Sequence, residues 1–272
     1  MAIPILLFLT VVLYGVGCWY SFRFYRDQDL QSDRTAARWL MAGLALQGTL
    51  LLLKGWMEGV APLVSLDGIL SALSFSLTAA LLVGRLKTPV GVLLSLFSPF
   101  LFLMALFAFI TGLPPMPLMD KALMTDRLAS HIFLTFLGFS HFTLGFGVGV
   151  AFWVQDGQLK QHRPGALTLP LPALEALDRL TVFYIGLGFL FWLAGLSLGT
   201  WEAYEVWDRL PWSDPKILGS FLVLGIYGLF FILRWSLRMR GRRSMVLVMA
   251  GYLLALFTFV GVKVLLNAPH GF

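Results

Sequence analysis

The sequence predicts an all-α, polytopic membrane protein with about eight transmembrane helices and both termini outside. The chain has 272 residues, of which 58% are hydrophobic and 12% charged, with a mean hydropathy of +0.83. Soluble domains carry about 25% charged residues. Several apolar runs also reach the roughly 20 residues that a helix needs to cross a bilayer. The basic residues lie mainly in short segments between these runs, as they do in membrane proteins.

The apolar runs define the expected spans. The first run lacks a charged start and a convincing small-residue cleavage site, so we expect a retained span rather than a signal peptide. No soluble domain or tandem repeat is visible. We expect two parts, an N-terminal four-helix half at 1–127 and a C-terminal half at 128–272. The expected spans are 2–22, 38–56, 62–84, 89–111, 128–154, 181–200, 217–235 and 245–266.

The distribution of Lys and Arg sets the expected orientation. If the N-terminus is outside, most of the 20 basic residues fall on the inner side. This bias is typical of bacterial plasma membrane proteins. The net charge of +6 therefore reflects topology, and we expect no nucleic acid partner. Cys18 is the only cysteine, so any thiol chemistry must belong to a partner protein.

The stretch GTWEAYEVWDRLPWSDPK, residues 199–216, combines three tryptophans with acidic residues. On the expected topology it lies outside, between spans six and seven. Tryptophan is common at membrane interfaces, which would explain one or two of them. Three within so short a segment indicate an aromatic shelf for a flat apolar ligand with charged edges, such as haem. These residues are Trp201, Trp207 and Trp212.

The acidic residues of this stretch allow a second interpretation. Glu202 and Glu205 would share a helical face, and Asp208 continues the spacing. Carboxylates without nearby histidine or cysteine suit hard cations such as magnesium. A solvated acidic segment is the simpler explanation.

The histidines are the remaining candidates for chemistry. His131 and His270 lie at the outer level on the expected topology, whereas His162 lies in the inner linker. His141 is about 15 Å below His131 along the same helix. An intramembrane histidine is a functional candidate, although a hydrogen bond to another helix would also explain it. The glycines of span six favour close helix packing; they are Gly186, Gly188, Gly195 and Gly199.

The 199–216 stretch resembles the tryptophan-rich WWD signature of the cytochrome c assembly superfamily. The family's form is approximately W-A-x-x-x-W-G-x-Y-W-x-W-D-P-K-E. This superfamily includes the haem-handling subunit of the system II synthase and the HemX-like and YpjD-like membrane proteins. The likeness extends over 128–272, including FVGVKVLLNAPHGF at the end, and more faintly to ARWLMAGLALQGTLLLL in span two.

The resemblance implies a haem b site on the outer side, and the departures described below limit the expected binding to one haem per chain at most. Two external histidines ligate haem iron in the family, and His131 and His270 fall at those positions. The resemblance places Asp214 with the three tryptophans in the degenerate WWD segment. In a haem site of this kind, we expect Lys216 or Lys263 to pair with the haem propionates.

The sequence also departs from the family pattern. Pro211 and Ser213 stand where aromatic residues are expected, and Ile217 replaces an acidic residue. The inner pair of membrane histidines in the synthases aligns with Gln47 and Ile232, neither of which ligates iron well. We therefore expect no inner haem site, and an accessory protein or haem carrier rather than a complete synthase.

We predict a haem-binding protein of cytochrome c assembly, acting at the outer face of the bacterial plasma membrane. Its expected partners are membrane lipid and other assembly membrane proteins or an apocytochrome. A haem-free membrane scaffold or regulatory subunit of the same fold is one alternative. A small-ion or metabolite transporter that uses His141, Asp67 and the acidic segment is another.

Overall fold

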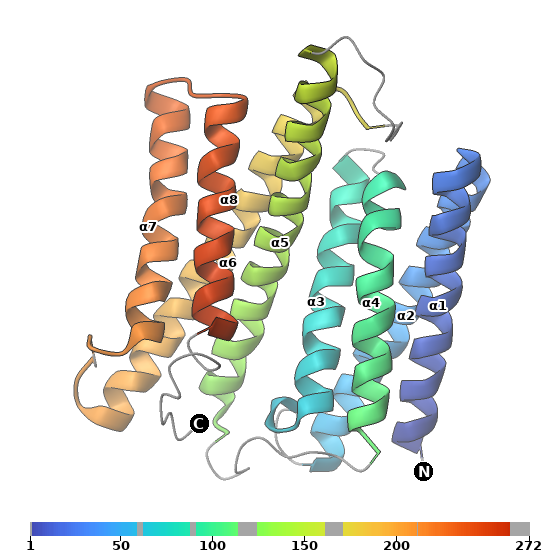
Figure 1. Ribbon diagram of the computed structural model, residues 1–272. Helices are drawn as coiled ribbons and strands as arrows, with labels where there is room; N and C mark the ends of the chain where they lie inside the picture. The colour runs from blue at the N-terminus through green and yellow to red at the C-terminus, as the bar shows by residue number, and fades with distance from the viewer. Residues whose placement is uncertain are drawn as a thin grey trace. The chain divides into compact units, whose positions relative to one another are not determined.

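The chain is helical almost throughout. The computed structural model describes residues 2–58, 62–87, 91–113, 124–160, 171–210 and 212–261. In these ranges eight helices are long and apolar enough to cross a membrane, which confirms the all-α class and the expected number of spans. The helices, shown in Figure 1, are α1 Ala2–Asp27, α2 Leu30–Glu58, α3 Leu66–Lys87, α4 Gly91–Thr111, α5 Asp126–Lys160, α6 Leu174–Trp207, α7 Pro215–Ser236 and α8 Arg242–Leu256. The sides on which the termini lie stay a prediction.

Helices α5 and α6 are longer than the spans predicted for them. At the end of α5, Lys160 donates to Asp156 at 2.8 Å, and at the start of α6, Arg179 donates to Glu175 at 2.7 Å. Both pairs have the i,i+4 spacing that supports an exposed helical turn. Hydropathy marks only the apolar part of each helix, so the polar extensions were missed.

Asp29 starts α2 from the short connection after α1. Its carboxylate accepts the Ser32 hydroxyl at 2.7 Å and the backbone N–H groups of Gln31 and Ser32 at 3.0 Å. These bonds satisfy donors that the first helical turn leaves free. The hydrogen bond from Ser32, followed by those from the backbone, holds the pKa of the Asp29 carboxyl below its usual value.

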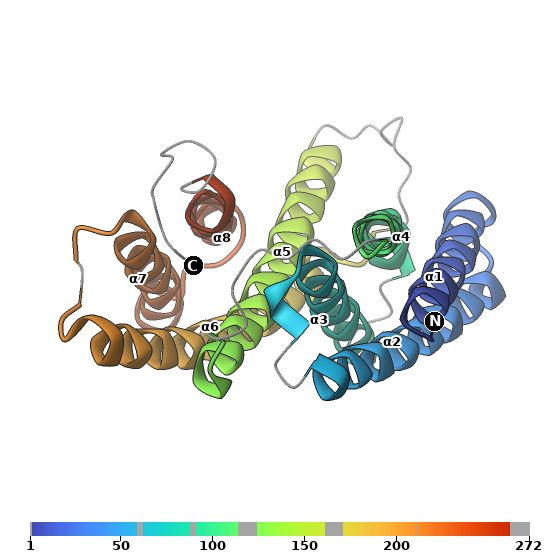
Figure 2. The same ribbon diagram turned by 90° about the horizontal axis from the view of Figure 1, so that it is seen from below.

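The described residues divide into two compact units, which we call unit 1 and unit 2. Unit 1 contains α1 to α4, and unit 2 contains α5 from Ser130 onward and α6 to α8. In unit 1, α1 packs against α2 and α4, and α3 packs against the same two helices, so the four form a closed bundle (Figure 2). In unit 2, α7 lies between α6 and α8. A π-helical turn, Phe257–Gly261, follows α8.

An arginine–aspartate pair holds two helices together in each unit. Arg85, in the last turn of α3, donates to both carboxylate oxygens of Asp33 near the start of α2, at 2.6 and 2.5 Å. Arg234, in the last turn of α7, bonds Asp178 near the start of α6 in the same way, at 3.1 and 2.5 Å. We call this end of each bundle the arginine end.

A glycine on the second helix of each unit faces an aromatic ring on the first. A Cβ built on Gly43 would lie 2.3 Å from the Tyr14 ring, and one on Gly188 would lie 2.6 Å from the Phe142 ring. Glycine at these positions lets two helices approach closely. The same close contact therefore occurs at the same place in both units.

Two further contacts follow the same pattern. Gly17 of α1 faces Leu40 as Gly145 of α5 faces Ile185. The spacing along the helices also agrees, so the two units repeat one packing frame although the sequence showed no tandem repeat. Tyr14, Gly17 and Phe24 of α1 are equivalent to Phe142, Gly145 and Phe152 of α5, in that order. Asp33, Leu40 and Gly43 of α2 are equivalent to Asp178, Ile185 and Gly188 of α6. Arg85 of α3 is equivalent to Arg234 of α7, and Gly91 of α4 to Gly241, which precedes α8.

Candidate functional site

The tryptophan segment begins as a helix. Gly199 to Trp207 form the last turns of α6, and the chain leaves the helix at Asp208. Asp208 has a φ of 51°, in the left-handed region that aspartate tolerates better than most residues. Trp201 and Trp207 are therefore fixed by the helix, whereas Trp212 lies in the following turn.

The D-P-K end of the segment starts α7. The Asp214 side chain accepts the Lys216 backbone N–H at 2.8 Å, and Pro215 takes the first helical position. Aspartate before the helix and proline at its first position are both preferred there. Asp214 thus has a clear structural role, and it fixes where Lys216 enters the helix.

All three tryptophans of the segment are exposed on unit 2. The exposed fractions are 58% for Trp201, 41% for Trp207 and 57% for Trp212. The Trp201 indole donates to Glu205 at 2.6 Å, and the Trp212 ring lies 5.3 Å from that of Phe221. The Trp201 and Trp212 rings are thus held by neighbouring side chains, and all three rings remain accessible to a ligand.

His131 lies on α5 with its ring against α6. Its Nδ1 is 2.6 Å from the carbonyl oxygen of Gly195. A carbonyl only accepts, so Nδ1 carries the hydrogen and donates it. In the neutral imidazole, Nε2 then keeps its lone pair, which is the form that ligates a metal.

Two glycines of α6 make room for this ring. A Cβ on Gly199 would lie 2.5 Å from both Nδ1 and Cε1 of His131. A Cβ on Gly195 would lie 2.8 Å from the hydroxyl of Thr135, which itself donates to the His131 carbonyl at 2.8 Å. The expected packing role is confirmed for these two and for Gly188, whereas Gly186 would bring only the Phe231 ring to an ordinary 3.8 Å.

Charged side chains also lie near the imidazole. Glu202 of α6 and Lys216 of α7 are close enough for their charges to act on His131. The second expected ligand, His270, and the second expected propionate partner, Lys263, lie outside the described residues, as do His162 and Pro211.

His141 is buried inside unit 2 and has an intrahelical partner. Its Nδ1 lies 2.7 Å from the carbonyl oxygen of Leu137, one turn earlier on α5. The ring packs against Phe191 and Tyr184 of α6, at 5.3 and 6.2 Å between centroids. The predicted hydrogen bond to another helix is therefore replaced by a bond within α5 and aromatic contacts.

The two positions aligned with an inner histidine pair have different surroundings. Gln47 is 1% exposed in unit 1, where it accepts the Tyr14 hydroxyl at 2.7 Å and donates to Ser74 at 2.6 Å. Ile232, in unit 2, is 59% exposed. Gln47 is thus occupied by protein partners, and Ile232 points away from the core of its unit.

The acidic interpretation of the segment finds no supporting geometry in the described part of the chain. There, no group of three or more His, Cys, Asp or Glu side chains is arranged to hold a metal ion. Glu205 instead accepts the Trp201 indole.

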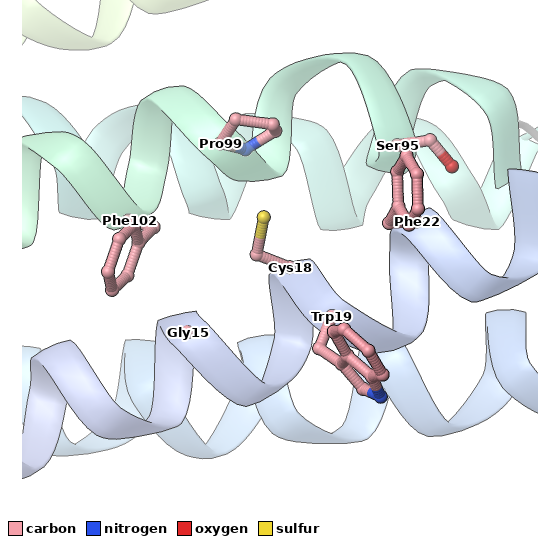
Figure 3. Close-up of a pocket in the computed structure, with 7 residues that line it drawn as sticks. All are labelled: Gly15, Cys18, Trp19, Phe22, Ser95, Pro99 and Phe102. Carbon is pink, nitrogen blue, oxygen red and sulfur yellow. The ribbon is translucent and has the colours of Figure 1, made fainter.

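A pocket of about 310 Å³ lies between α1 and α4 of unit 1. Figure 3 shows the Cys18 thiol pointing from α1 toward Pro99 of α4, with Phe102 beside it. At the equivalent positions of unit 2, Phe146 and Tyr252 stack with centroids 4.6 Å apart. The pocket exists because Cys18 leaves out an aromatic ring that fills this place in the other unit.

The sequence did not reveal that Gly195 and Gly199 are the residues of α6 against which His131 packs. Their i,i+4 spacing is a signal for close helix packing, but it does not name the partner. Trp192 was also missed; its indole donates to the Ser220 carbonyl at 3.1 Å and ties α6 to α7.

Comparisons with known proteins give relatives of similar length. The chain is 27% identical to Protein HemX of Bacillus subtilis (strain 168), over 86% of this chain and 85% of the relative. It is 25% identical to Protein HemX of Brevibacillus brevis, over 93% of each chain. It is 26% identical to Cytochrome c biogenesis protein CcsA of Thermosynechococcus vestitus (strain NIES-2133 / IAM M-273 / BP-1), over 98% of this chain and 93% of the relative.

No solved structure matches the chain. The family model described as Cytochrome C assembly protein matches residues 63–270, which include all of α3 to α8 and the His131 site. The chain therefore belongs to the cytochrome c assembly protein family.

Proposed function

We propose that this protein binds haem at the outer face of a bacterial plasma membrane and acts in cytochrome c assembly. The relatives named as cytochrome c biogenesis proteins support the process. The observation that carries the proposal is the His131–Gly195 hydrogen bond of 2.6 Å. It fixes the tautomer in which Nε2 is free to ligate iron, as backbone carbonyls do for many metal-binding histidines.

The surroundings of His131 fit a haem. A haem has a flat apolar macrocycle, an iron that accepts imidazole, and two propionates. The exposed tryptophans of unit 2 offer flat apolar surface, and Lys216 offers a cation near His131. A bound haem would supply the iron and its coordination chemistry. The chain's part, among the described residues, is to position the His131 imidazole as a ligand. His270 is proposed as the second iron ligand, on the basis of the family resemblance.

One haem per chain is the expected stoichiometry. Gln47 is buried and hydrogen-bonded to Tyr14 and Ser74, and it ligates iron poorly. Ile232 has no ligating atom. We infer an accessory or carrier role beside other assembly membrane proteins or an apocytochrome, rather than that of a complete synthase.

Absorption spectroscopy of the full chain, purified in detergent and supplied with haem, tests the ligand. The wild type should give a Soret band of six-coordinate, imidazole-ligated haem. His131→Ala should weaken this band strongly, and imidazole added to the buffer should restore part of it, because the missing ligand is replaced. His162→Ala is the matched control, since the expected topology places it across the membrane. Equal spectra from both variants would exclude His131 as a ligand.

The side of the membrane needs its own test. In a Cys18→Ser background, cysteine at Asp208 should react with an impermeant thiol reagent in intact cells, whereas cysteine at Arg240 should react only after lysis. Labelling of the Arg240→Cys variant in intact cells would reverse the orientation and remove the proposed outer site.

A further inference from the structure

Unit 1 contains a buried polar column that the proposed function does not use. One face of α3 carries four polar side chains at helical spacing, each no more than 2% exposed. They are Asp67, Ser71, Ser74 and Thr78. Polar and ionisable residues buried in a membrane bundle are costly and commonly mark a pathway for ions or protons.

A charged cluster occupies one end of this column. The Lys54 ammonium, on α2, bonds the Asp67 carboxylate and the Ser65 hydroxyl, the latter at 2.7 Å, and lies 3.9 Å from Glu58. Lys54 and Asp67 are 3% and 2% exposed. The second oxygen of Asp67, Oδ1, is buried and has no hydrogen-bond partner among the described residues.

The middle of the column is a closed hydrogen-bond network. Tyr14 donates to Gln47 at 2.7 Å, Gln47 donates to Ser74 at 2.6 Å, and Thr78 lies 3.1 Å from the Tyr14 hydroxyl. All four side chains are at most 1% exposed. Three helices thus contribute hydroxyl or amide groups to one continuous set.

Toward the arginine end, the polar face of α3 stops, since Leu81 takes its next position. The polar groups continue there on α1 and α4. The Ser95 hydroxyl donates to the Ser21 carbonyl at 2.7 Å, so these two residues lie at one level. Ser98 is one turn closer to Tyr14. The hydroxyls of Ser21 and Ser98 are buried without a partner in the described ranges.

Measured along the helix axes, these groups follow one another at short intervals. At a rise of 1.5 Å per residue, successive levels are about 4.5–6 Å apart, from Asp67 through the network to Ser95 and Gly91. The Asp33–Arg85 pair lies beside Gly91, since a Cβ there would be 2.8 Å from the Asp33 carboxylate. One water can bridge such a gap when polar groups face it, and the unpartnered hydroxyls are groups of this kind.

Unit 2 shows that the packing frame does not require this column. The network residues Tyr14, Gln47, Ser74 and Thr78 correspond to Phe142, Trp192, Val223 and Tyr227. There the Phe142 ring stacks on Tyr227 at 4.1 Å and lies 5.7 Å from Trp192. The arginine–aspartate pair is kept in both units, which identifies it as structural, whereas of the four column residues of α3 only Ser71 has the same residue type, Ser220, at its equivalent position.

We propose that unit 1 conducts protons across the membrane along this column. A proton entering at the charged cluster is taken up by the free oxygen of Asp67. It passes by successive transfers between water oxygens and the hydroxyls of Ser71, Ser74, Thr78, Tyr14 and Ser98, and leaves beside Asp33. The Gln47 amide takes no part in the transfers and holds the Tyr14 and Ser74 hydroxyls in place. Each transfer breaks one O–H bond and forms another, so no oxidant or reductant is needed. The arginine end is the exit or the entrance according to the direction of the driving force.

Proton flux into liposomes tests this proposal. The full chain is reconstituted, a potassium gradient with valinomycin sets the membrane potential, and an enclosed dye reports pH. The wild type should admit protons faster than protein-free liposomes. Ser98→Ala removes a hydroxyl that has no partner among the described residues, so folding should be unaffected. The proton flux of this variant should fall by about tenfold or more, because the proton loses its hydroxyl partner at the position of Ser98.

Ser140→Ala is the matched control. Ser140 is also 1% exposed and its hydroxyl also lacks a partner in the described residues, but it lies in unit 2. Its flux should equal that of the wild type. Tyr14→Phe and Thr78→Val are second variants that should lower flux. Wild-type flux at the protein-free level, or undiminished flux in both Ser98→Ala and Tyr14→Phe, would overturn the proposal. The haem spectrum should be the same in all these variants, so the two proposals fail separately.

Discussion

At the middle of unit 1, Tyr14 exchanges hydrogen bonds with Gln47 and Thr78, whereas at the equivalent place in unit 2, Phe142 stacks on Tyr227. The helices around both sets meet through the same glycine contacts and the same arginine–aspartate pair. This shared helix packing therefore determines which positions contact one another. It does not determine whether the side chains at those positions are polar or aromatic. Chemistry that differs within a common frame is the best guide to function in this chain.

The two units differ again at the end opposite the arginines. In unit 2, Gly199 leaves space for the His131 ring, and in unit 1 the equivalent position is Lys54, which bonds Asp67. The position equivalent to His131 is Ile3. Unit 1 thus has neither the imidazole nor the space for it, which assigns the proposed haem site to unit 2 and the proposed proton pathway to unit 1.

The largest expected effect comes from the feature that both units share. Asp33→Ala and Asp178→Ala should each lower the free energy of unfolding by about 3 kcal/mol, because each leaves a largely buried arginine without its partner. Thermal unfolding in detergent, followed by circular dichroism, gives the comparison. A large loss in one variant only would break the equivalence of the two pairs.

A smaller loss is expected from the glycine contacts. Gly43→Ala and Gly188→Ala should each cost about 2 kcal/mol, because the new methyl group would lie inside the contact distance of an aromatic ring. Gly225→Ala has nothing within 4 Å of its Cβ and serves as the control. The same melting experiment applies, and a tolerated Gly188→Ala would show that the frame in unit 2 is looser than in unit 1.

The smallest effect separates the polar core from the aromatic one. Tyr14→Phe should cost about 1 kcal/mol, since Gln47 loses a short hydrogen bond inside the bundle. Tyr227→Phe should cost less, because the Tyr227 hydroxyl lies 3.4 Å from the Val248 carbonyl, and the stacked ring is kept. Equal losses would mean that the two cores depend on their hydroxyls alike.

Much of this architecture follows from sequence patterns. Apolar run length predicted the helices, because a helix needs roughly 20 apolar residues to cross a bilayer. The internal repetition was not predictable, since contacts such as Gly43–Tyr14 and Gly188–Phe142 keep geometry but share little residue identity. The buried Lys54–Asp67 pair was missed for a related reason. At the level of sequence, lysines and arginines served as signals of topology, and nothing in the local sequence shows that Lys54 turns inward.

The candidate site was predictable only in part. His131 came from its membrane level and from the family resemblance, whereas its tautomer depends on the Gly195 carbonyl, which belongs to another helix. Sequence spacing carries no information about which carbonyl a ring nitrogen meets. Asp214 was assigned to the shelf by resemblance, and its hydrogen bond to Lys216 shows a capping role that the D-P-K order alone would have indicated.

The central claim is that His131 ligates haem. The most direct test changes the α6 surface against which His131 packs and leaves the histidine itself unchanged. Gly199→Ala places a methyl group where the imidazole lies, while Gly186→Ala, on the same helix, meets only an ordinary contact. Haem absorption of the two purified variants is the measurement. The account predicts that Gly199→Ala loses most of the Soret band of imidazole-ligated haem and that Gly186→Ala keeps the wild-type spectrum. Wild-type spectra from both would contradict a haem held by His131.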